Sequence, residues 1–435
     1  MKRTLFSLLL GIVALGAVAQ EPENNEIIKK GWNFGPLPVV GWDSDLGFQY
    51  GACLDIFNFG DGSNYPSYDY KMNVEASTYT GGSSLIRFYG DFKTLIPNGK
   101  LFIDCTYFNA KKFDFYGYNG YASPFFADGI GIPEDETSAL NWMSRNQFRL
   151  VASMQRRITG NLHWAVGLGY YNITTGRVKL DEYKDQTTLY DHYRTAGLIR
   201  EDEARGGNVL QLKAGLVYDT RDHDSDPTRG LNIEATIVGA PDIIDREGYS
   251  NLGFTFVGSH YVPIYKDRLT FAYRIGIQTN IAGEIPFYFI NNLNTLFFRK
   301  VYTEGLGGNA SVRGINRNGV VGNGMAWLNT EFRWRFVNFR FINQNFHLAL
   351  NPFFDMGKVI QSYRLDEQKA AHALYSDSTV NPFYSGDKEK LHATVGCGLK
   401  VVMNRNFVIS VEMAKALDKR DGEKLWNNIG FNYLF

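Results

Sequence analysis

The sequence has few cysteines, few prolines and no net charge, and each of these features excludes a class of protein. The chain has three cysteines, Cys53, Cys105 and Cys397, which are too few and too widely spaced for a disulfide framework or a zinc site. Its 13 prolines in 435 residues are too few for a disordered, proline-rich chain. The 45 basic and 45 acidic side chains cancel, so the positive charge typical of a nucleic-acid-binding protein is missing.

Long apolar runs are confined to the first twenty residues. Lys2 and Arg3 precede an apolar run over residues 5–16, and the small residues at 17–19 (AVA) are typical of a signal-peptide cleavage site. The run is shorter than the roughly 20 residues that a membrane-spanning helix needs. We therefore predict that residues 1–19 are a cleaved signal peptide and that the mature protein leaves the cytoplasm.

Motifs for catalysis or metal binding are also missing. The sequence contains no G-x-S-x-G, no phosphate-binding P-loop and no H-E-x-x-H. Residues 222–227 (DHDSDP) begin like a calcium-binding loop, but Pro227 stands where glycine is needed and Ile233 where a glutamate is needed. We predict no enzymatic activity, no metal and no cofactor.

Residues that form strands and turns are abundant, with 26 Tyr, 32 Phe and 45 Gly. Within 391–403 (LHATVGCGLKVVM), every second side chain from Leu391 onward is apolar, and the other face carries His392 and Lys400. The same period of two runs through 146–158 and 208–220. Such long alternating strands are typical of outer-membrane barrels, and an open sheet edge in lipid would leave backbone groups unpaired. The pattern therefore predicts a closed, membrane-spanning sheet.

Links of two kinds alternate along the chain, as periplasmic turns and surface loops do in such barrels. Short links are expected at 96–99, 157–161, 265–267, 337–339 and 404–406, and long links at 110–142, 176–207, 283–324 and 360–389. We predict an all-β, transmembrane antiparallel β-barrel of 16 strands over residues 35–435. Residues 20–34 would form a short periplasmic N-terminal segment.

The end of the chain, LWNNIGFNYLF, continues the alternation. Phe431, Tyr433 and Phe435 share one face of this predicted last strand. Aromatic rings are favoured at the membrane–water interface. We therefore predict that these three rings point outward as a C-terminal strand signal.

One long link contains the segment GGNASVRGINRNG, residues 307–319. Here the sequence resembles the BamA/TamA superfamily (bacterial surface antigens) of outer-membrane barrels. In that family a long loop folds into the lumen and carries Val-Arg-Gly-Phe or Val-Arg-Gly-Tyr at its tip. This chain has Val312, Arg313, Gly314 and Ile315, and therefore lacks the aromatic residue at the fourth position.

Other segments are similar to the same family in the same order. Residues 218–230 look like the end of a family strand and its turn, and 325–336 and 351–359 look like the two strands that follow the loop. The alternation places Glu331 and Asp355 on inward faces, where the resemblance implies acidic residues. The match covers about 210–435, whereas the N-terminal half fits only as a barrel in general.

Arg313 has a defined role in this interpretation. Its planar guanidinium suits bidentate pairing with Glu331 or Asp355, which would pin the loop to the inner wall. Gly314 would permit a positive φ or a close backbone approach beside it. The role that we expect for Arg313 is architectural and not catalytic.

The resemblance implies a barrel that inserts outer-membrane proteins or exports proteins to the surface. Assembly members of the family carry periplasmic POTRA domains, but only about fifteen residues separate Gln20 from the first predicted strand. We expect a short member without POTRA domains, in the bacterial outer membrane, with client or cargo proteins and with accessory periplasmic or surface subunits or a homodimer as partners. The alternatives are a diffusion channel or structural scaffold and, less favoured, an enzyme of the lumen or surface.

Overall fold

The computed structural model describes residues 27–43, 46–124, 139–183, 185–266, 268–296, 304–375 and 381–435. The predicted signal peptide at 1–19 and the first part of the predicted N-terminal segment lie outside these residues. None of the helices in the described ranges is long and apolar enough to cross a membrane.

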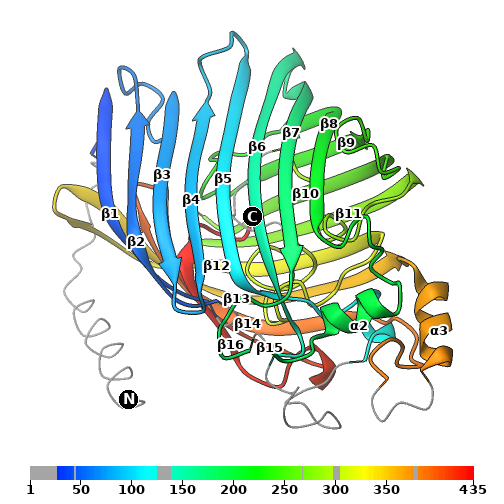
Figure 1. The fold of residues 1–435 in the computed structure, drawn as a ribbon. Helices are drawn as coiled ribbons and strands as arrows, with labels where there is room; N and C mark the ends of the chain where they lie inside the picture. Colours follow the sequence, from blue (N-terminus) through cyan, green and yellow to red (C-terminus); the bar gives the residue numbers. More distant parts are fainter. Residues whose placement is uncertain are drawn as a thin grey trace, which may run out of the picture.

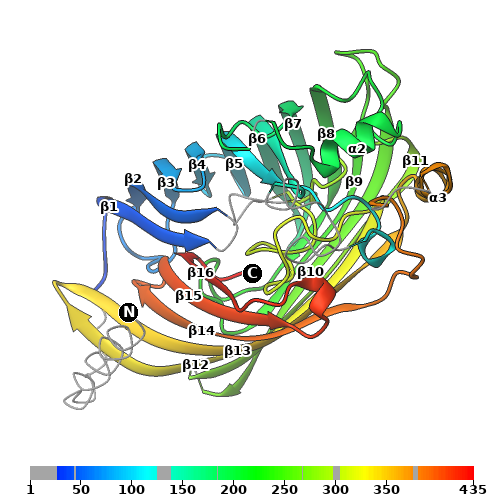
Figure 2. The ribbon, with the colours of Figure 1, turned by 60° about the horizontal axis from the view of Figure 1, so that its bottom comes forward.

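Sixteen antiparallel strands form one closed barrel, in which each strand pairs with its neighbours in sequence and β1 pairs with β16 (Figures 1 and 2). The prediction of a 16-strand barrel is therefore confirmed. The strands are β1 Trp32–Asp43, β2 Gly47–Asn58, β3 Tyr70–Tyr79, β4 Ser83–Phe92, β5 Gly99–Asp114, β6 Trp142–Thr159, β7 Leu162–Gly176, β8 Gly206–Asp219, β9 Gly230–Ala240, β10 Asn251–Tyr265, β11 Leu269–Gly283, β12 Gly324–Phe341, β13 Gln344–Gln361, β14 His392–Met403, β15 Phe407–Ala416 and β16 Trp426–Phe431.

The alternation in sequence corresponds to the two faces of the wall. In β15, Val408, Ser410 and Glu412 are buried in the interior, whereas Val411 and Met413 are 41% and 50% exposed on the outer face. Outward apolar residues suit lipid, and inward residues can be polar because the lumen is not lipid.

The two ends of the barrel differ in the length of their connections. The links that follow β6, β10, β12 and β14 are short turns, whereas those that follow β5, β7, β11 and β13 are long. Short turns mark the periplasmic end and long loops the surface end. One short link was wrongly predicted at 337–339, because β12 continues to Phe341 and turns at 342–343. A register shift between Arg335 and Val337 breaks the alternation there and imitates a strand end.

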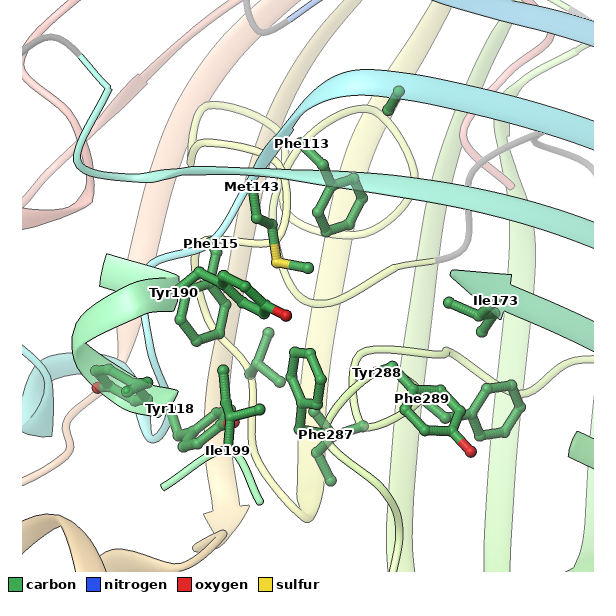
Figure 3. Packing of buried hydrophobic residues seen from close by; sticks show 14 of the residues in the cluster. Phe113, Phe115, Tyr118, Met143, Ile173, Tyr190, Ile199, Phe287, Tyr288 and Phe289 are labelled. Atoms are coloured by element: carbon green, nitrogen blue, oxygen red, sulfur yellow. The ribbon is translucent and has the colours of Figure 1, made fainter. Parts of the chain in front are cut away.

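Loops close the surface end of the barrel. Helix α2 (Leu189–Thr195) lies in the loop before β8 and helix α3 (Leu365–Leu374) in the loop before β14 (Figure 1). Aromatic side chains from four loops and the adjoining strand ends pack edge to face beneath them (Figure 3). The ring centroids of Phe115 and Tyr193 are 5.2 Å apart, and those of Tyr118 and Tyr363 are 4.8 Å apart. We call this cluster the aromatic roof.

A turn closes much of the periplasmic end. Residues 220–229 connect β8 to β9, and their acidic side chains pair with cations from other parts of the rim. Asp224 lies 2.5 Å from Lys93 after β4, Asp226 lies 2.8 Å from Arg335 in β12, and Asp222 lies 3.1 Å from Arg405 after β14. Charged contacts on several sides hold this segment, the periplasmic turn, across the mouth of the barrel.

Candidate functional site

The loop between β11 and β12 lies inside the barrel, against the inner wall (Figure 2). Backbone hydrogen bonds of 2.9 and 3.1 Å join Leu306 and Val320 into a narrow ladder. Val312 is fully buried and belongs to an apolar cluster with Leu306, Trp327 and Val359. Because this cluster includes Val312 and Ile315 on either side of Arg313 and Gly314, the tip of the loop has a defined position against the wall.

Arg313 is fully buried among three carboxylates from three strands. Its Nε and Nη2 donate to the two carboxylate oxygens of Asp355 in β13 at 2.7 and 3.0 Å. Its Nη1 donates to Glu331 in β12 at 3.1 Å and to Glu412 in β15 at 2.9 Å. The guanidinium also lies 3.5 Å from the ring centroid of Phe353. The structure thus brings together the three residues singled out in the sequence and adds Glu412.

Two further cations balance the charge of this cluster. Arg333 donates to Glu331 at 2.6 Å, and Lys400 donates to Glu412 at 2.6 Å. Three cations therefore face three carboxylates in a dry site, where an unpaired charge would be costly. Because the carboxylates belong to β12, β13 and β15, the loop arginine links a broad section of wall.

Gly314 allows the tip to approach the wall closely. Its φ is +99°, a conformation that side-chain-bearing residues rarely adopt. A Cβ at this position would lie 2.9 Å from the Cβ of Ala414 and 3.2 Å from that of Thr394. Ile315, which replaces the family's aromatic residue, is buried in the same apolar cluster as Val312.

The last residues of the chain turn into the lumen, so the predicted outward position of Tyr433 and Phe435 is wrong. Asn432 has a φ of +66°, which ends β16 and redirects the chain. Tyr433 and Phe435 are then 1% and 3% exposed, and Arg333 lies 4.2 and 5.2 Å from their ring centroids. Arg333 also donates to the main-chain oxygen of Phe435 at 2.7 Å. Of the three predicted rings, only Phe431 stays in the strand.

The junction of β1 and β16, which we call the seam, is the weakest in the barrel. Only two residue pairs join these strands, Trp42 with Ile429 and Asp43 with Asn428. On its other side, β1 pairs with β2 over twelve residues. β16 has six residues because the chain leaves the wall after Phe431. Much of the edge of β1 therefore lacks a strand partner.

A cavity of about 190 Å³ lies directly behind the seam. Its lining includes Asn428 and Phe431 of β16 and charged residues of the neighbouring strands β2 and β3, among them Asp55, Lys71 and Glu75. This space is polar and mixed in charge, and its lining includes Trp42 and Asp43, the two β1 residues that pair with β16. Within the described residues, no group of three or more histidine, cysteine or acidic side chains is arranged to hold a metal ion.

A family model for the Omp85 superfamily domain matches residues 102–433, well over half of the chain. The chain belongs to the Omp85 superfamily. This confirms the family expected from the loop motif and places the barrel in the bacterial outer membrane. None of the curated proteins compared with the chain matches it.

Two solved structures share the fold of this Omp85 barrel. BamA from Haemophilus ducreyi lacking POTRA domains 1–3 is 15% identical, with a TM-score of 0.54 over 93% of this chain and 70% of that one. CdiB from Escherichia coli is 11% identical, with a TM-score of 0.55 over 95% of this chain and 66% of that one. At these identities the likeness concerns the fold.

Two members of the site, Glu412 and Lys400, were missed in the sequence although a signal was present. Glu412 lies in a strictly alternating segment whose other inward residues are Val408, Ser410, Ala414 and Ala416, so its inward position could be read from the sequence. The alternation within 391–403 places Lys400 on the inward face in the same way. The inward turn of the tail had no such signal, because the alternation continues to the last residue.

Proposed function

We propose that this Omp85 barrel helps to insert outer-membrane proteins or to export proteins to the surface, and that the seam opens when it acts. The observation that carries the proposal is the pairing of β1 and β16 over two residue pairs. A backbone hydrogen bond contributes about 0.5–1.5 kcal/mol net, so separating this junction costs little compared with separating the twelve-pair junction of β1 and β2.

The surroundings of the seam support the same function. Backbone groups exposed to lipid are costly when they are unpaired, but the polar cavity behind the seam offers them an aqueous environment. A client segment that enters at the seam could place its polar side chains in this cavity and its apolar side chains toward lipid. Accessory periplasmic or surface subunits would deliver such clients.

A diffusion channel is the second candidate, and the closed ends of the barrel argue against it. The aromatic roof covers the surface end, and ion pairs hold the periplasmic turn across the other end. The lumen loop occupies space between them. A structural scaffold would not require a weak seam beside a polar cavity.

A disulfide across the seam tests the proposal. In a variant with all three native cysteines replaced by alanine, Trp42→Cys and Ile429→Cys place two thiols at directly paired positions, within reach of a disulfide. Val40→Cys with Tyr50→Cys is the matched control, because this exposed pair lies in the junction of β1 and β2. Two activities are measured. The first is the rate at which a urea-unfolded outer-membrane barrel folds into vesicles that contain each variant. The second is the amount of exported protein displayed on the surface of cells that carry each variant.

We expect the seam disulfide to abolish both activities until a reductant is added, and the control disulfide to leave them unchanged. Full activity of the oxidised seam variant would refute the proposal. Isolation of the barrel in mild detergent tests the partners: a stoichiometric periplasmic or surface subunit supports the assisted mechanism, whereas a lone barrel or a homodimer contradicts it.

A further inference from the structure

Six exposed cationic side chains lie along the periplasmic end of β6 to β12. They are Arg156, Arg157, Arg229, Lys266, Arg268 and Arg340. None of them forms an ion pair with a carboxylate of the described residues. We call this set the basic belt. Exposed charges of one sign without partners mark a surface that can attract ligands of the opposite sign.

The cations of the basic belt lie at the ends of strands from β6 to β12, at the β6–β7, β8–β9 and β10–β11 turns and near the end of β12. Arg156 in β6 is registered with Trp164 in β7, and the carbonyl of Arg268 accepts a hydrogen bond of 2.7 Å from the backbone of Arg335 in β12. Strand order puts the centre of the belt at β9. In a ring of sixteen strands, β8 and β9 lie opposite the seam, as Figure 2 shows.

Exposed aromatic and apolar side chains accompany the cations. Tyr265, Ile158 and Trp334 are 57%, 51% and 50% exposed at the same end of the wall. The ammonium group of Lys266 lies 5.7 Å from the ring centroid of Tyr265. Aromatic rings beside long cationic side chains are the composition of a membrane–water interface, where the rings sit at headgroup level. The belt therefore lies at the depth of the periplasmic headgroups.

Cations near the seam are arranged differently. Lys93 and Arg405 point into the mouth, where they pair with Asp224 and Asp222 of the periplasmic turn. Lys29 donates to the carbonyl of Asn343 at 3.0 Å. Lys30 is the exposed exception on this side. Because Lys29 contacts Asn343 in the β12–β13 turn, Arg340 lies at the seam end of the belt, whereas the other five cations lie on the wall away from the seam.

We infer that the basic belt binds the phosphate groups of anionic phospholipids in the periplasmic leaflet and anchors the wall opposite the seam. Guanidinium groups suit phosphate oxygens, and each cation near an anionic membrane surface strengthens binding about fivefold. Anchoring on one side leaves the lipid around the seam easier to displace. The lipid site does not depend on the proposed function, because a channel or scaffold would be anchored in the same way.

Retention of lipid by the purified full chain tests the inference. The protein is mixed with equal amounts of phosphatidylglycerol and phosphatidylcholine in mild detergent, and bound lipid is counted by native mass spectrometry. In the belt variant all six cations are changed to glutamine. The control variant carries the same change at six exposed cations of the surface end, which are Arg246, Lys358, Lys388, Lys390, Lys415 and Lys419. A heat-modifiable gel shift shows that both variants are folded.

We expect the wild-type barrel to bind more phosphatidylglycerol than phosphatidylcholine. The ratio of the two bound lipids should fall at least fivefold in the belt variant and less than twofold in the control variant. Raised salt should weaken the wild-type preference, because exposed charges are screened. Equal losses in the two variants would mean that any positive surface suffices and would overturn the inference. An unchanged preference in the belt variant would overturn it as well.

Discussion

Arg313 joins the lumen loop to carboxylates from β12, β13 and β15. Arg313→Ala leaves Arg333 and Lys400 as the remaining cations of a buried cluster. Removing one member of such a cluster costs about 3–5 kcal/mol, because an uncompensated charge stays behind. We expect a lower midpoint temperature in the heat-modifiable gel shift and a loss of activity.

Two control variants accompany this prediction. Arg313→Lys keeps the charge but loses the planar fork, so its midpoint should lie between those of the wild type and Arg313→Ala. Lys390→Ala, on an exposed part of the loop before β14, should change nothing. A wild-type midpoint and full activity of Arg313→Ala would show that the apolar cluster around Val312 holds the loop without the arginine.

The effect of a side chain at Gly314 can be measured against a control, because the chain contains a second glycine, Gly248, with nearly the same backbone conformation. Gly314 and Gly248 have φ values of +99° and +97°, but a Cβ at Gly248 would meet nothing within 4 Å. Gly248→Ala therefore incurs only the backbone strain, roughly 1–2 kcal/mol. Gly314→Ala adds a clash with Ala414 and Thr394 that typically costs about 1–3 kcal/mol more. Equal shifts of the two unfolding midpoints would contradict the close approach of the loop to the wall.

The periplasmic turn is an element whose stability should depend on pH through His223. Burial, with a contribution from Arg405, lowers the pKa of His223 to about 4. Its Nδ1 accepts hydrogen bonds of 3.2 Å from the backbone N–H groups of Ser225 and Asp226, so it acts as an acceptor in the neutral ring. Protonation would remove this acceptor and place a charge in a buried site.

The direction of the effect follows from the lowered pKa. An exposed histidine titrates near 6.5, so the released turn takes up a proton below that pH while the packed turn stays neutral until about 4. The packed turn is fully stable above pH 6.5 and loses up to about 3 kcal/mol as the pH falls toward 4. Although burial alone would raise it, the pKa of Asp224 is held well below its usual range by Lys93, Lys100 and Arg221. The stability that the ionised Asp224 carboxylate gives to the turn is therefore lost only at a lower pH than the stability that depends on His223.

A spin label attached at Ser225→Cys, in a variant with the native cysteines replaced by alanine, reports the state of the turn. We expect the label to become more mobile between pH 7 and pH 5. His223→Asn is the control, because its carbonyl oxygen can accept the same backbone hydrogen bonds and does not titrate. An identical pH profile in this variant would assign the change to another group.

The elements of the fold differ in how far the sequence predicts them. The strands were predictable because lipid on one face and the lumen on the other impose a period of two, as in 391–403 and 407–416. The short turn at 342–343 was misplaced because a bulge after Arg335 interrupts that period. The tail was misplaced because Tyr433 and Phe435 keep the period, while a single left-handed residue, Asn432, changes their direction. Backbone reversals of this kind leave no trace in the spacing of apolar residues.

At the scale of the whole molecule, the lumen is closed at both ends, by the aromatic roof at the surface end and by the periplasmic turn at the other. The aromatic roof depends on rings such as Phe115, Tyr190 and Phe287, which come from different loops (Figure 3). The periplasmic turn depends on ion pairs at the other end. Because an ion must pass both, opening one of them leaves the other as the barrier.

This arrangement predicts conductance in planar bilayers. We expect the wild-type barrel to conduct little, and expect the same of a roof variant (Tyr118→Ala with Phe287→Ala) and of a turn variant (Asp224→Asn with Asp226→Asn). The roof variant removes edge-to-face packing, and the turn variant removes the carboxylates that pair with Lys93 and Arg335. Only the combined variant should show steps of the size expected for a barrel with an open lumen. Large steps in the wild type would favour the diffusion channel, whereas a silent combined variant would mean that the lumen loop seals the barrel alone.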